Sequence, residues 1–324
     1  MKDYIIRKIK RKTKNKYSYD YVDKKQNKVR KELVKCCLDG LYIPPAHDNV
    51  KINLSKKAKI RAIGYDNKGR AQYTYNKKHI EKQSKSKFKH MIQFGESYKK
   101  IFNQINRDLY TESDSKEKQI ASVLKIVIDC NFRIGNDKYS KENNSFGVTT
   151  LENRHIKVNK DTVTIDFIGK KGVRNTCKVR NKKLSKNFKR KKKTLTKNDR
   201  IFMYRVNNKY YNIKSSDVNK YLKKFGNFTA KNFRTWGANL EFIQQLVKMD
   251  KEKTQSKRKK NVSEALQKVA HKLHNTSTVC KSNYIDPYLI ETYMNHSKKF
   301  FTIFKRTKTK EEITDGYLKL LRSK

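Results

Sequence analysis

The 324-residue sequence predicts an α+β protein, with a small β-rich domain over residues 1–85 and a larger, mainly α-helical domain over residues 86–324. Short alternating runs separated by turn residues fill the first domain, whereas apolar residues recur at helical spacing through most of the second. A polar stretch, residues 82–87, separates the two patterns, and we expect a linker there. Hydrophobic residues make up 35% of the chain, which is enough to bury a core.

The clearest element of the N-terminal domain is a β-hairpin. Residues 58–63 and 72–75 alternate apolar or aromatic side chains with polar ones. Residues 66–69 (DNKG), between them, are typical of a tight turn.

Within the C-terminal domain, residues 162–168 alternate as a β-strand, and residues 173–179 can return as its partner. Residues 169–172 (GKKG) join them, so the sequence predicts a hairpin with lysines at its tip. Two basic runs, residues 189–193 and 257–260, lie between the predicted elements. We interpret them as loops that are either solvated or lie along phosphates.

Three apolar stripes predict the main helices of the C-terminal domain. Each stripe advances mostly by three or four residues, which places its side chains on one face of a helix. We expect all three faces to be buried, and Asp114 with Glu117 to form a capping box before the first helix. The stripes are Ile120, Val123, Leu124, Val127 and Ile128; Phe233, Trp236, Leu240, Ile243 and Val247; and Val262, Ala265, Leu266, Val269, Ala270 and Leu273.

The charge of the chain indicates a polyanionic partner. Lys and Arg number 81 against 30 Asp and Glu, a net charge of +51. Nucleic acid is favoured over a membrane surface because the basic residues are spread along the chain rather than gathered on one amphipathic helix. The sequence contains neither a run of 18 apolar residues nor a signal peptide, so we expect a protein that is neither membrane-spanning nor secreted.

The cysteines predict neither a disulfide framework nor a zinc site. Their number is odd and they contain no C-x-x-C pair, so we expect reduced thiols in or near a core. His271 and His274 are three residues apart but lack further ligands, and we predict no metal site there. The cysteines are Cys36, Cys37, Cys130, Cys177 and Cys280.

The chain also lacks the usual nucleotide and metal motifs: the lysine at 170 has no P-loop around it, and acidic residues are too few for a two-metal site. Metal-free cleavage of a phosphodiester needs a nucleophile, cations on the non-bridging oxygens and an acid for the leaving oxygen. Tyrosine, arginine and lysine suit these three tasks. Candidates near the ends of the predicted elements are Arg133, Lys170, Arg234 and Tyr284.

Five segments occur in a characteristic order: residues 133–139 (RIGNDKY), 146–151 (FGVTTL), 167–170 (FIGK), 231–236 (KNFRTW) and 275–284 (NTSTVCKSNY). Together they resemble the type IB DNA topoisomerases, in the small form of poxviruses, giant viruses and bacteria. Residues 69–75 (GRAQYTY) with His79 resemble the small β domain of that family. The resemblance runs from about residue 40 to 290, and it implies a catalytic domain of the tyrosine recombinase/type IB topoisomerase kind.

The resemblance implies an activity and a role for each candidate. Tyr284 would attack a DNA phosphodiester and form a 3′-phosphotyrosyl link, leaving a 5′-hydroxyl that later attacks back after the strand has swivelled. Arg133 and Arg234 would bind the non-bridging oxygens, Lys170 would protonate the departing oxygen, and Lys231 would assist. Because the phosphotyrosine stores the bond energy, the relaxation of supercoils would need neither ATP nor a metal.

The family implies one further donor nine residues before the tyrosine. Poxvirus members usually have histidine there, whereas this sequence has Asn275, as bacterial relatives do, with His274 beside it. The spacing favours Asn275, because one residue along a helix rotates the side chain by about 100°.

The family also implies double-stranded DNA as the partner, clamped by a monomer. The location would be intracellular, with DNA, or, for a poxvirus-like protein, the virion and the host cytoplasm. The residues expected to contact DNA are Arg70, Gln72, Tyr73, Tyr75, Asn136 and Tyr139.

Two other functions remain open. A tyrosine recombinase or integrase shares the same chemistry, but it typically has histidine three residues before the second arginine, where this chain has Lys231. The N-terminal hairpin also favours a topoisomerase. A non-enzymatic basic DNA-packaging or RNA-binding protein would account for the charge but not for the ordered motifs.

Overall fold

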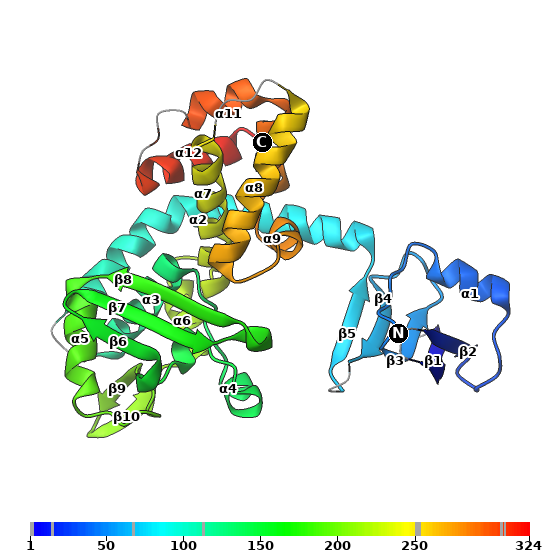
Figure 1. Cartoon of the computed structure of the whole chain (residues 1–324), viewed down its shortest axis with the longest axis horizontal. Coiled ribbons are helices and arrows are strands. Elements are labelled where there is room, and N and C mark those ends of the chain that lie inside the picture. Colours follow the sequence, from blue (N-terminus) through cyan, green and yellow to red (C-terminus); the bar gives the residue numbers. More distant parts are fainter. Residues whose placement is uncertain are drawn as a thin grey trace. The chain divides into compact units, whose positions relative to one another are not determined.

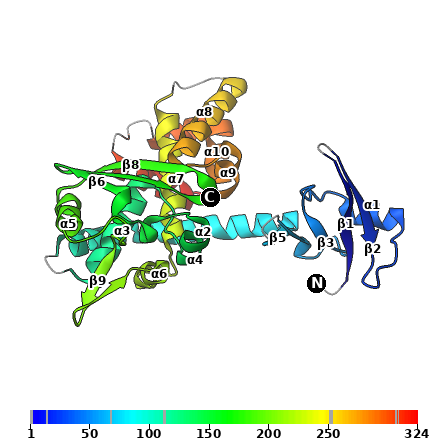
Figure 2. The same ribbon diagram turned by 60° about the horizontal axis from the view of Figure 1, so that its bottom comes forward.

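The computed structural model describes residues 3–13, 16–66, 69–111, 114–249, 254–304, 307 and 309–324. Its elements follow one another along the chain as labelled in Figure 1. The long helix α2 (Lys77–Tyr110, cyan in Figures 1 and 2) includes residues 82–87. The expectation of a linker there is therefore wrong, because the lysine and glutamine residues of that stretch are good helix formers and no glycine or proline interrupts them.

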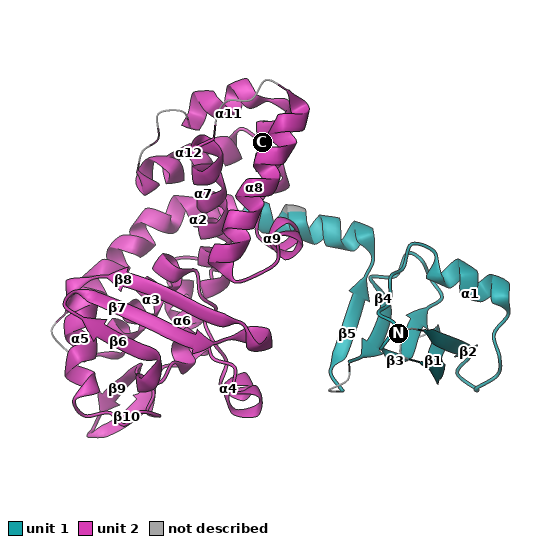
Figure 3. Ribbon diagram, in the orientation of Figure 1, with its two compact units in different colours: residues 1–89 teal, residues 90–324 magenta. Residues whose placement is uncertain are grey.

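The chain divides into two compact units, residues 1–89 and residues 90–324 (Figure 3). We call them unit 1 and unit 2. As the sequence predicts, unit 1 is β-rich and unit 2 is mostly helical, so the fold is mixed α and β. None of the helices in the described part of the chain has both the length and the apolar character that a bilayer span requires.

The described strands of unit 1 form a five-stranded antiparallel sheet in the order β2-β1-β3-β4-β5. The predicted hairpin is confirmed, since Ile63 pairs with Tyr73, although turn residues 67 and 68 lie outside the described residues. A short helix, α1 (Lys31–Leu38), was not predicted; Cys37 is its one fully buried residue, so its apolar stripe is weak. The strands are β1 (Tyr4–Lys12), β2 (Tyr17–Val22), β3 (Asp48–Asn53), β4 (Ile60–Tyr65) and β5 (Ala71–Tyr75).

The first half of unit 2 combines a small antiparallel sheet with helices. Its strand order is β6-β7-β8, where β7 (Thr162–Ile168) and β8 (Arg174–Arg180) form the predicted hairpin. Helix α3 (Lys116–Cys130) contacts β8, and α5 (Lys182–Lys192) contacts β6 and β7. The other elements are α4 (Asp137–Asn143), β6 (Ile156–Asn159), β9 (Met203–Val206), β10 (Lys209–Asn212) and α6 (Ser215–Lys223).

The second half of unit 2 is helical and is organised around α7, which contacts α3, α6, α8, α11 and α12. The predicted stripes are confirmed: those of α3 and α8 are buried throughout, and that of α7 is buried except for Val247, which is half-buried. The helices are α7 (Ala230–Val247), α8 (Gln255–Leu273), α9 (Ser277–Asn283), α10 (Pro287–Asn295), α11 (Ser297–Phe304) and α12 (Lys310–Arg322).

The last helix, α12, packs against α7. The Tyr317 ring is fully buried, with its centroid 4.8 Å from that of Trp236. Arg322 forms an ion pair of 2.8 Å with Glu96 of α2. Trp236 lies two residues after Arg234, so this packing stabilises the turn of α7 that carries Arg234.

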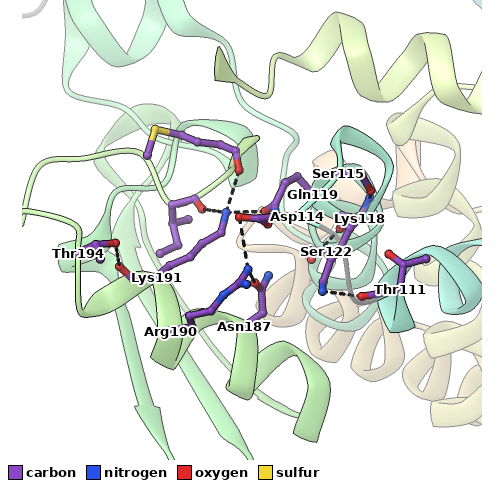
Figure 4. A network of polar contacts seen from close by, with 12 residues as sticks. Thr111, Asp114, Ser115, Lys118, Gln119, Ser122, Asn187, Arg190, Lys191 and Thr194 are labelled. Carbon is purple, nitrogen blue, oxygen red and sulfur yellow. Dashed lines mark hydrogen bonds and ion pairs between the residues drawn. The ribbon is translucent and has the colours of Figure 1, made fainter. Parts of the chain in front are cut away.

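Three local expectations are wrong. The N-cap of α3 is Ser115, whose side chain accepts from Lys118 N, rather than Asp114. The basic run 189–193 lies mostly within α5, and the run 257–260 lies within α8, not in loops. In α5, Lys191 is buried and donates to Gln119 Oε1 and to two backbone carbonyls (Figure 4). This lysine therefore helps to hold the fold together, which its charge alone does not indicate.

The cysteine expectation is also wrong in part. Cys130 and Cys177 form a disulfide, whereas Cys36, Cys37 and Cys280 are free. The pair is separated by 47 residues and becomes adjacent only because β8 packs against the end of α3. Sequence spacing carries no signal for such a contact.

Candidate active site

Arg133 lies just beyond the end of α3, in a segment that the following loop holds in place. Asn131 caps α3 in the left-handed conformation, with φ 53°. The Arg133 carbonyl then accepts a hydrogen bond of 2.9 Å from Val148 N. A Cβ on Gly147 would lie 2.5 Å from the Gly135 Cα, so glycine is required where the two segments meet. The backbone of Arg133 is therefore fixed, while its side chain remains partly exposed.

Arg234 projects from the first half of α7 and is 4% exposed. Its Nη2 donates to the Leu273 carbonyl at 3.3 Å, and its guanidinium carbon lies 5.4 Å from the centroid of the Tyr284 ring. Burial lowers the pKa of Arg234, and the positive charge of Arg133 acts in the same direction. Its Nε has no hydrogen-bond partner in the described part of the chain. A buried donor without a partner is unfavourable unless a ligand oxygen supplies one.

Tyr284 directly follows the short helix α9 and is 9% exposed. Its N–H donates to the Cys280 carbonyl at 2.9 Å, and its own carbonyl accepts from Asn239 Nδ2 at 2.8 Å. Asn239 Oδ1 in turn accepts from Asp286 N at 2.8 Å. Helix α7 therefore carries Arg234 and also fixes the backbone directly after Tyr284.

Asn275 connects the two arginines. Its Oδ1 accepts from Arg133 Nη2 at 2.9 Å, and its Nδ2 donates at 3.3 Å to the same Leu273 carbonyl that Arg234 contacts. His274 turns elsewhere: it ends α8 in the left-handed conformation, and its ring packs against Phe132 with centroids 5.8 Å apart. Burial lowers the pKa of His274, which favours the neutral ring.

Lys170 and Lys231 are exposed and stand apart from this cluster. Lys170 begins the turn Lys170–Gly172, which is closed by a backbone hydrogen bond of 2.8 Å from Gly169 N to the Val173 carbonyl. Among the described residues, neither lysine hydrogen-bonds to the arginines, to Asn275 or to Tyr284. Lys231 lies one turn before Arg234 on α7, which puts both on the same side of the helix.

The end of β7 that leads into the Lys170 turn adjoins the Arg133 segment. The rings of Phe132 and Phe167 meet edge to face at 5.0 Å. Phe146 N donates to the Ile168 carbonyl at 2.9 Å. Lys170 thus lies two residues beyond a strand end that packs beside the Arg133 segment.

The remaining predicted DNA contacts lie on the surface of their units. In unit 2, Asn136 caps α4 by accepting from Lys138 N at 2.9 Å, and Tyr139 is 52% exposed. In unit 1, Tyr73 and Tyr75 are exposed on β5 with their rings stacked at 6.3 Å. Arg70 and Gln72, beside them, both hydrogen-bond to Asp66 Oδ2.

Sequence reasoning missed Asn239. The signal was present, because Asn239 stands beside the apolar stripe of α7 and is 0% exposed, and a buried amide must find partners. Its partners, Tyr284 and Asp286, are more than 40 residues away in the chain, so the sequence does not identify them.

The converging groups are two guanidiniums, one carboxamide and one phenol. Guanidiniums bind phosphate oxygens in pairs, and a hydroxyl beside the bound phosphorus can act as a nucleophile. Burial raises the pKa of Cys280 to about 11, so this nearby thiol stays neutral at physiological pH. The set is suited to covalent phosphoryl transfer.

Comparison with known proteins identifies the family. Residues 76–312 match the catalytic core of eukaryotic DNA topoisomerase I, and residues 18–66 match the N-terminal domain of bacterial DNA topoisomerase IB. The chain is 34% identical over 299 residues to DNA topoisomerase 1B of Acanthamoeba polyphaga mimivirus, covering 89% of this chain and 88% of that one. It is 25% identical over 247 residues to DNA topoisomerase 1B of Vaccinia virus (strain Copenhagen), covering 76% and 75%. The resemblance predicted from the sequence is confirmed, and the chain belongs to the type IB DNA topoisomerase family.

Proposed function

We propose that Arg133, Arg234, Asn275 and Tyr284 form the strand-cleavage centre of this type IB DNA topoisomerase. The observation that supports it most is that the Arg234 guanidinium lies beside the Tyr284 ring, while Asn275 links Arg133 to the Leu273 carbonyl that Arg234 also contacts. In the first step, the Tyr284 oxygen attacks the phosphorus and the 5′-oxygen leaves, giving a 3′-phosphotyrosyl ester. The cut strand swivels, the supercoils relax, and the 5′-hydroxyl attacks back and releases the phenol.

Arg133 and Arg234 act on the charge that develops on the non-bridging oxygens. Arg234 is buried and its Nε lacks a partner among the described residues, so binding a phosphate oxygen there satisfies a donor that is already desolvated. Asn275 orients Arg133 through the 2.9 Å hydrogen bond to its Nη2. Donors fixed in this way before the reaction need no reorganisation in the transition state.

Lys170 is the general acid for the 5′-oxygen, and Lys231 is an assisting cation. An exposed lysine on a hairpin turn can move toward a leaving oxygen once DNA is bound. General acid catalysis contributes roughly 10² to 10⁴ in rate. Transesterification exchanges one phosphate ester for another, so the cycle conserves bond energy and consumes no ATP.

We extend this proposal to the whole chain. Residues 1–85 form a DNA-clamp domain in which Arg70, Gln72, Tyr73 and Tyr75 contact DNA, and residues 86–324 form a catalytic domain with the fold shared with tyrosine recombinases. In the catalytic domain, Asn136 and Tyr139 contact bases or phosphates from α4. The enzyme acts as a monomer that encloses DNA, in the compartment where intracellular DNA lies.

A plasmid-relaxation assay in EDTA and without ATP tests the proposal. We expect relaxation by the wild-type protein and by Tyr210→Phe, a control that removes a phenol oxygen from a residue that is 63% exposed. Tyr284→Phe should be inactive. A denaturing gel with DNA labelled at the 5′ end of the cut strand should show a protein–DNA adduct for the first two proteins only. Relaxation by Tyr284→Phe would show that another residue is the nucleophile.

A further inference from the structure

The disulfide between Cys130 and Cys177 joins the two segments that carry Arg133 and Lys170. Cys130 ends α3, three residues before Arg133, and Cys177 lies on β8, the strand that leaves the Lys170 turn. In the hairpin register Cys177 lies opposite Ile165, three residues before the end of β7. The bond therefore attaches β8, the returning strand of the hairpin, to the end of α3, three residues before Arg133.

The two strands of the hairpin are held differently. β7 is the central strand, paired with both neighbours, and it also has the contacts of Phe167 with Phe132 and of Ile168 with Phe146. β8 is an edge strand, and its one partner among the described strands is β7. The disulfide to α3 therefore restrains the strand of the hairpin that has a neighbouring strand on one side only among the described residues.

The bond is accessible to exchange from one side. Cys130 is 4% exposed, whereas Cys177 is half-buried on the edge strand. The thiolate of a small thiol would attack the Cys177 sulfur, break the disulfide and release Cys130 as a thiolate that takes up a proton. A second thiol would then attack the mixed disulfide and free Cys177. The protein disulfide gains two electrons and two protons, and two small thiols become one small-molecule disulfide.

We propose that the Cys130–Cys177 bond is a redox-sensitive restraint that keeps Lys170 within reach of the leaving oxygen. With the bond intact, the hairpin is confined beside the Arg133 segment. After reduction by a thiol of the glutathione class, β8 samples a wider range of positions, and proton delivery slows because the acid is less often in place. This inference rests on the role of Lys170 proposed above.

Single-turnover DNA cleavage by the full-length protein, oxidised or reduced, tests the restraint. Two substrates are compared, one with the natural 5′-oxygen and one with 5′-sulfur at the scissile bond, since a sulfur leaving group needs little protonation. We expect reduction to slow cleavage of the oxygen substrate about tenfold and that of the sulfur substrate less than about twofold. Alkylation after denaturation verifies the redox state, with three free cysteines in the oxidised protein.

Two variants separate the restraint from other thiol effects. Cys177→Ser should behave like the reduced wild-type protein on both substrates and should not respond to reductant. Cys36→Ser removes an exposed, free thiol in unit 1 and should keep the full response. Equal rates of oxygen-substrate cleavage in both redox states would overturn the inference. So would a parallel loss on the sulfur substrate, or five alkylated cysteines after equilibration with excess glutathione disulfide.

A separate readout distinguishes failure of this inference from failure of the Lys170 assignment. If Lys170→Ala is slowed equally on both substrates, Lys170 is not the acid. Hydrogen exchange in residues 174–180 then still tests the restraint, because reduction should speed exchange in β8 and in the β7 amides that donate to it, while leaving the β7 amides that donate to β6 unchanged. Unchanged exchange in β8 would show that the bond does not confine the hairpin.

Discussion

The two sides of the candidate active site differ in how firmly the fold holds their reactive groups. On the α7–α9 side, Arg234 and Tyr284 are 4% and 9% exposed, and Asn239 fixes the backbone of the tyrosine. On the hairpin side, Lys170 is exposed on a turn whose tip is closed by backbone hydrogen bonds. The difference matches two chemical tasks. Groups that stabilise developing charge act best when fixed, whereas an acid that serves both cleavage and religation has to approach and withdraw.

The largest effect is expected at the fixed side, to which Arg133 also belongs because Asn275 holds its Nη2. Arg234→Ala and Arg133→Ala should each slow single-turnover cleavage roughly 10³-fold, which corresponds to about 4 kcal/mol, because their interactions strengthen in the transition state. Affinity for uncleaved DNA, measured by a mobility shift, should change less than about threefold.

The 5′-sulfur substrate makes this comparison between the two sides sharper. Lys170→Ala should be largely rescued on it, since no strong acid is needed, whereas the two arginine variants should stay slow. Equal rescue of all three variants would mean that the arginines also act on the leaving group, and the division into a fixed and a mobile side would fail.

A smaller effect is expected at the residue that bridges the arginines. Asn275→Ala removes the acceptor that holds Arg133 Nη2, and cleavage should slow about 10- to 100-fold. His274→Ala should slow it less than about threefold, because the ring packs on Phe132 rather than on the arginines. The pair of rates, measured on the same substrate, decides between the two neighbours. A larger loss for His274→Ala would assign the position to the histidine.

What the sequence predicts well are elements whose burial is periodic. The stripes of α3, α7 and α8 and the alternation of residues 162–168 depend on local side-chain order, and each appears in the structure at the predicted place. The ordered motifs then led to Arg133, Arg234, Asn275 and Tyr284, which the fold brings together. Assignment of their roles remains a prediction from the family.

What the sequence does not predict depends on contacts between distant segments. The Cys130–Cys177 bond and the clamp of Asn239 on Tyr284 join residues more than 40 positions apart. The failed linker at residues 82–87 has another cause: polarity alone does not distinguish a solvated helix from a loop, and α2 continues through it.

The close approach of α7 to the end of α3 provides a third, structural test of the fixed side. A Cβ on Gly237 would run into the carboxamide of Asn131, which caps α3. Gly237→Ala should therefore lower the free energy of unfolding by about 2 kcal/mol and slow cleavage, because the shift of α7 separates Arg234 from Arg133.

Relief of that contact supplies the control. Adding Asn131→Gly removes the carboxamide and tolerates the φ of 53° at the cap, so the double variant should recover most of the lost stability and rate. Stability is measured by urea unfolding. A double variant no better than Gly237→Ala would show that the glycine is needed for another reason.

The smallest effect on cleavage rate is expected at Lys191, where the change is one of stability and where the environment is the reverse of that of Lys170. Lys191 donates to Gln119 Oε1 at 2.8 Å and to the carbonyls of Ile201 and Met203 (Figure 4), and burial lowers its pKa from 10.5 to about 8. Between these two pH values the unfolded chain binds more protons than the folded one, so this residue makes stability rise as the pH increases from 8 to 10.5. Relative to Lys191→Met, the free energy of unfolding of the wild-type protein should therefore gain up to about 3 kcal/mol across that range, measured by urea unfolding at each pH. Parallel curves for the two proteins would place the folded-state pKa of Lys191 near its unfolded value, and the contrast between this buried structural lysine and the exposed lysine that we propose as the acid would lose its electrostatic basis.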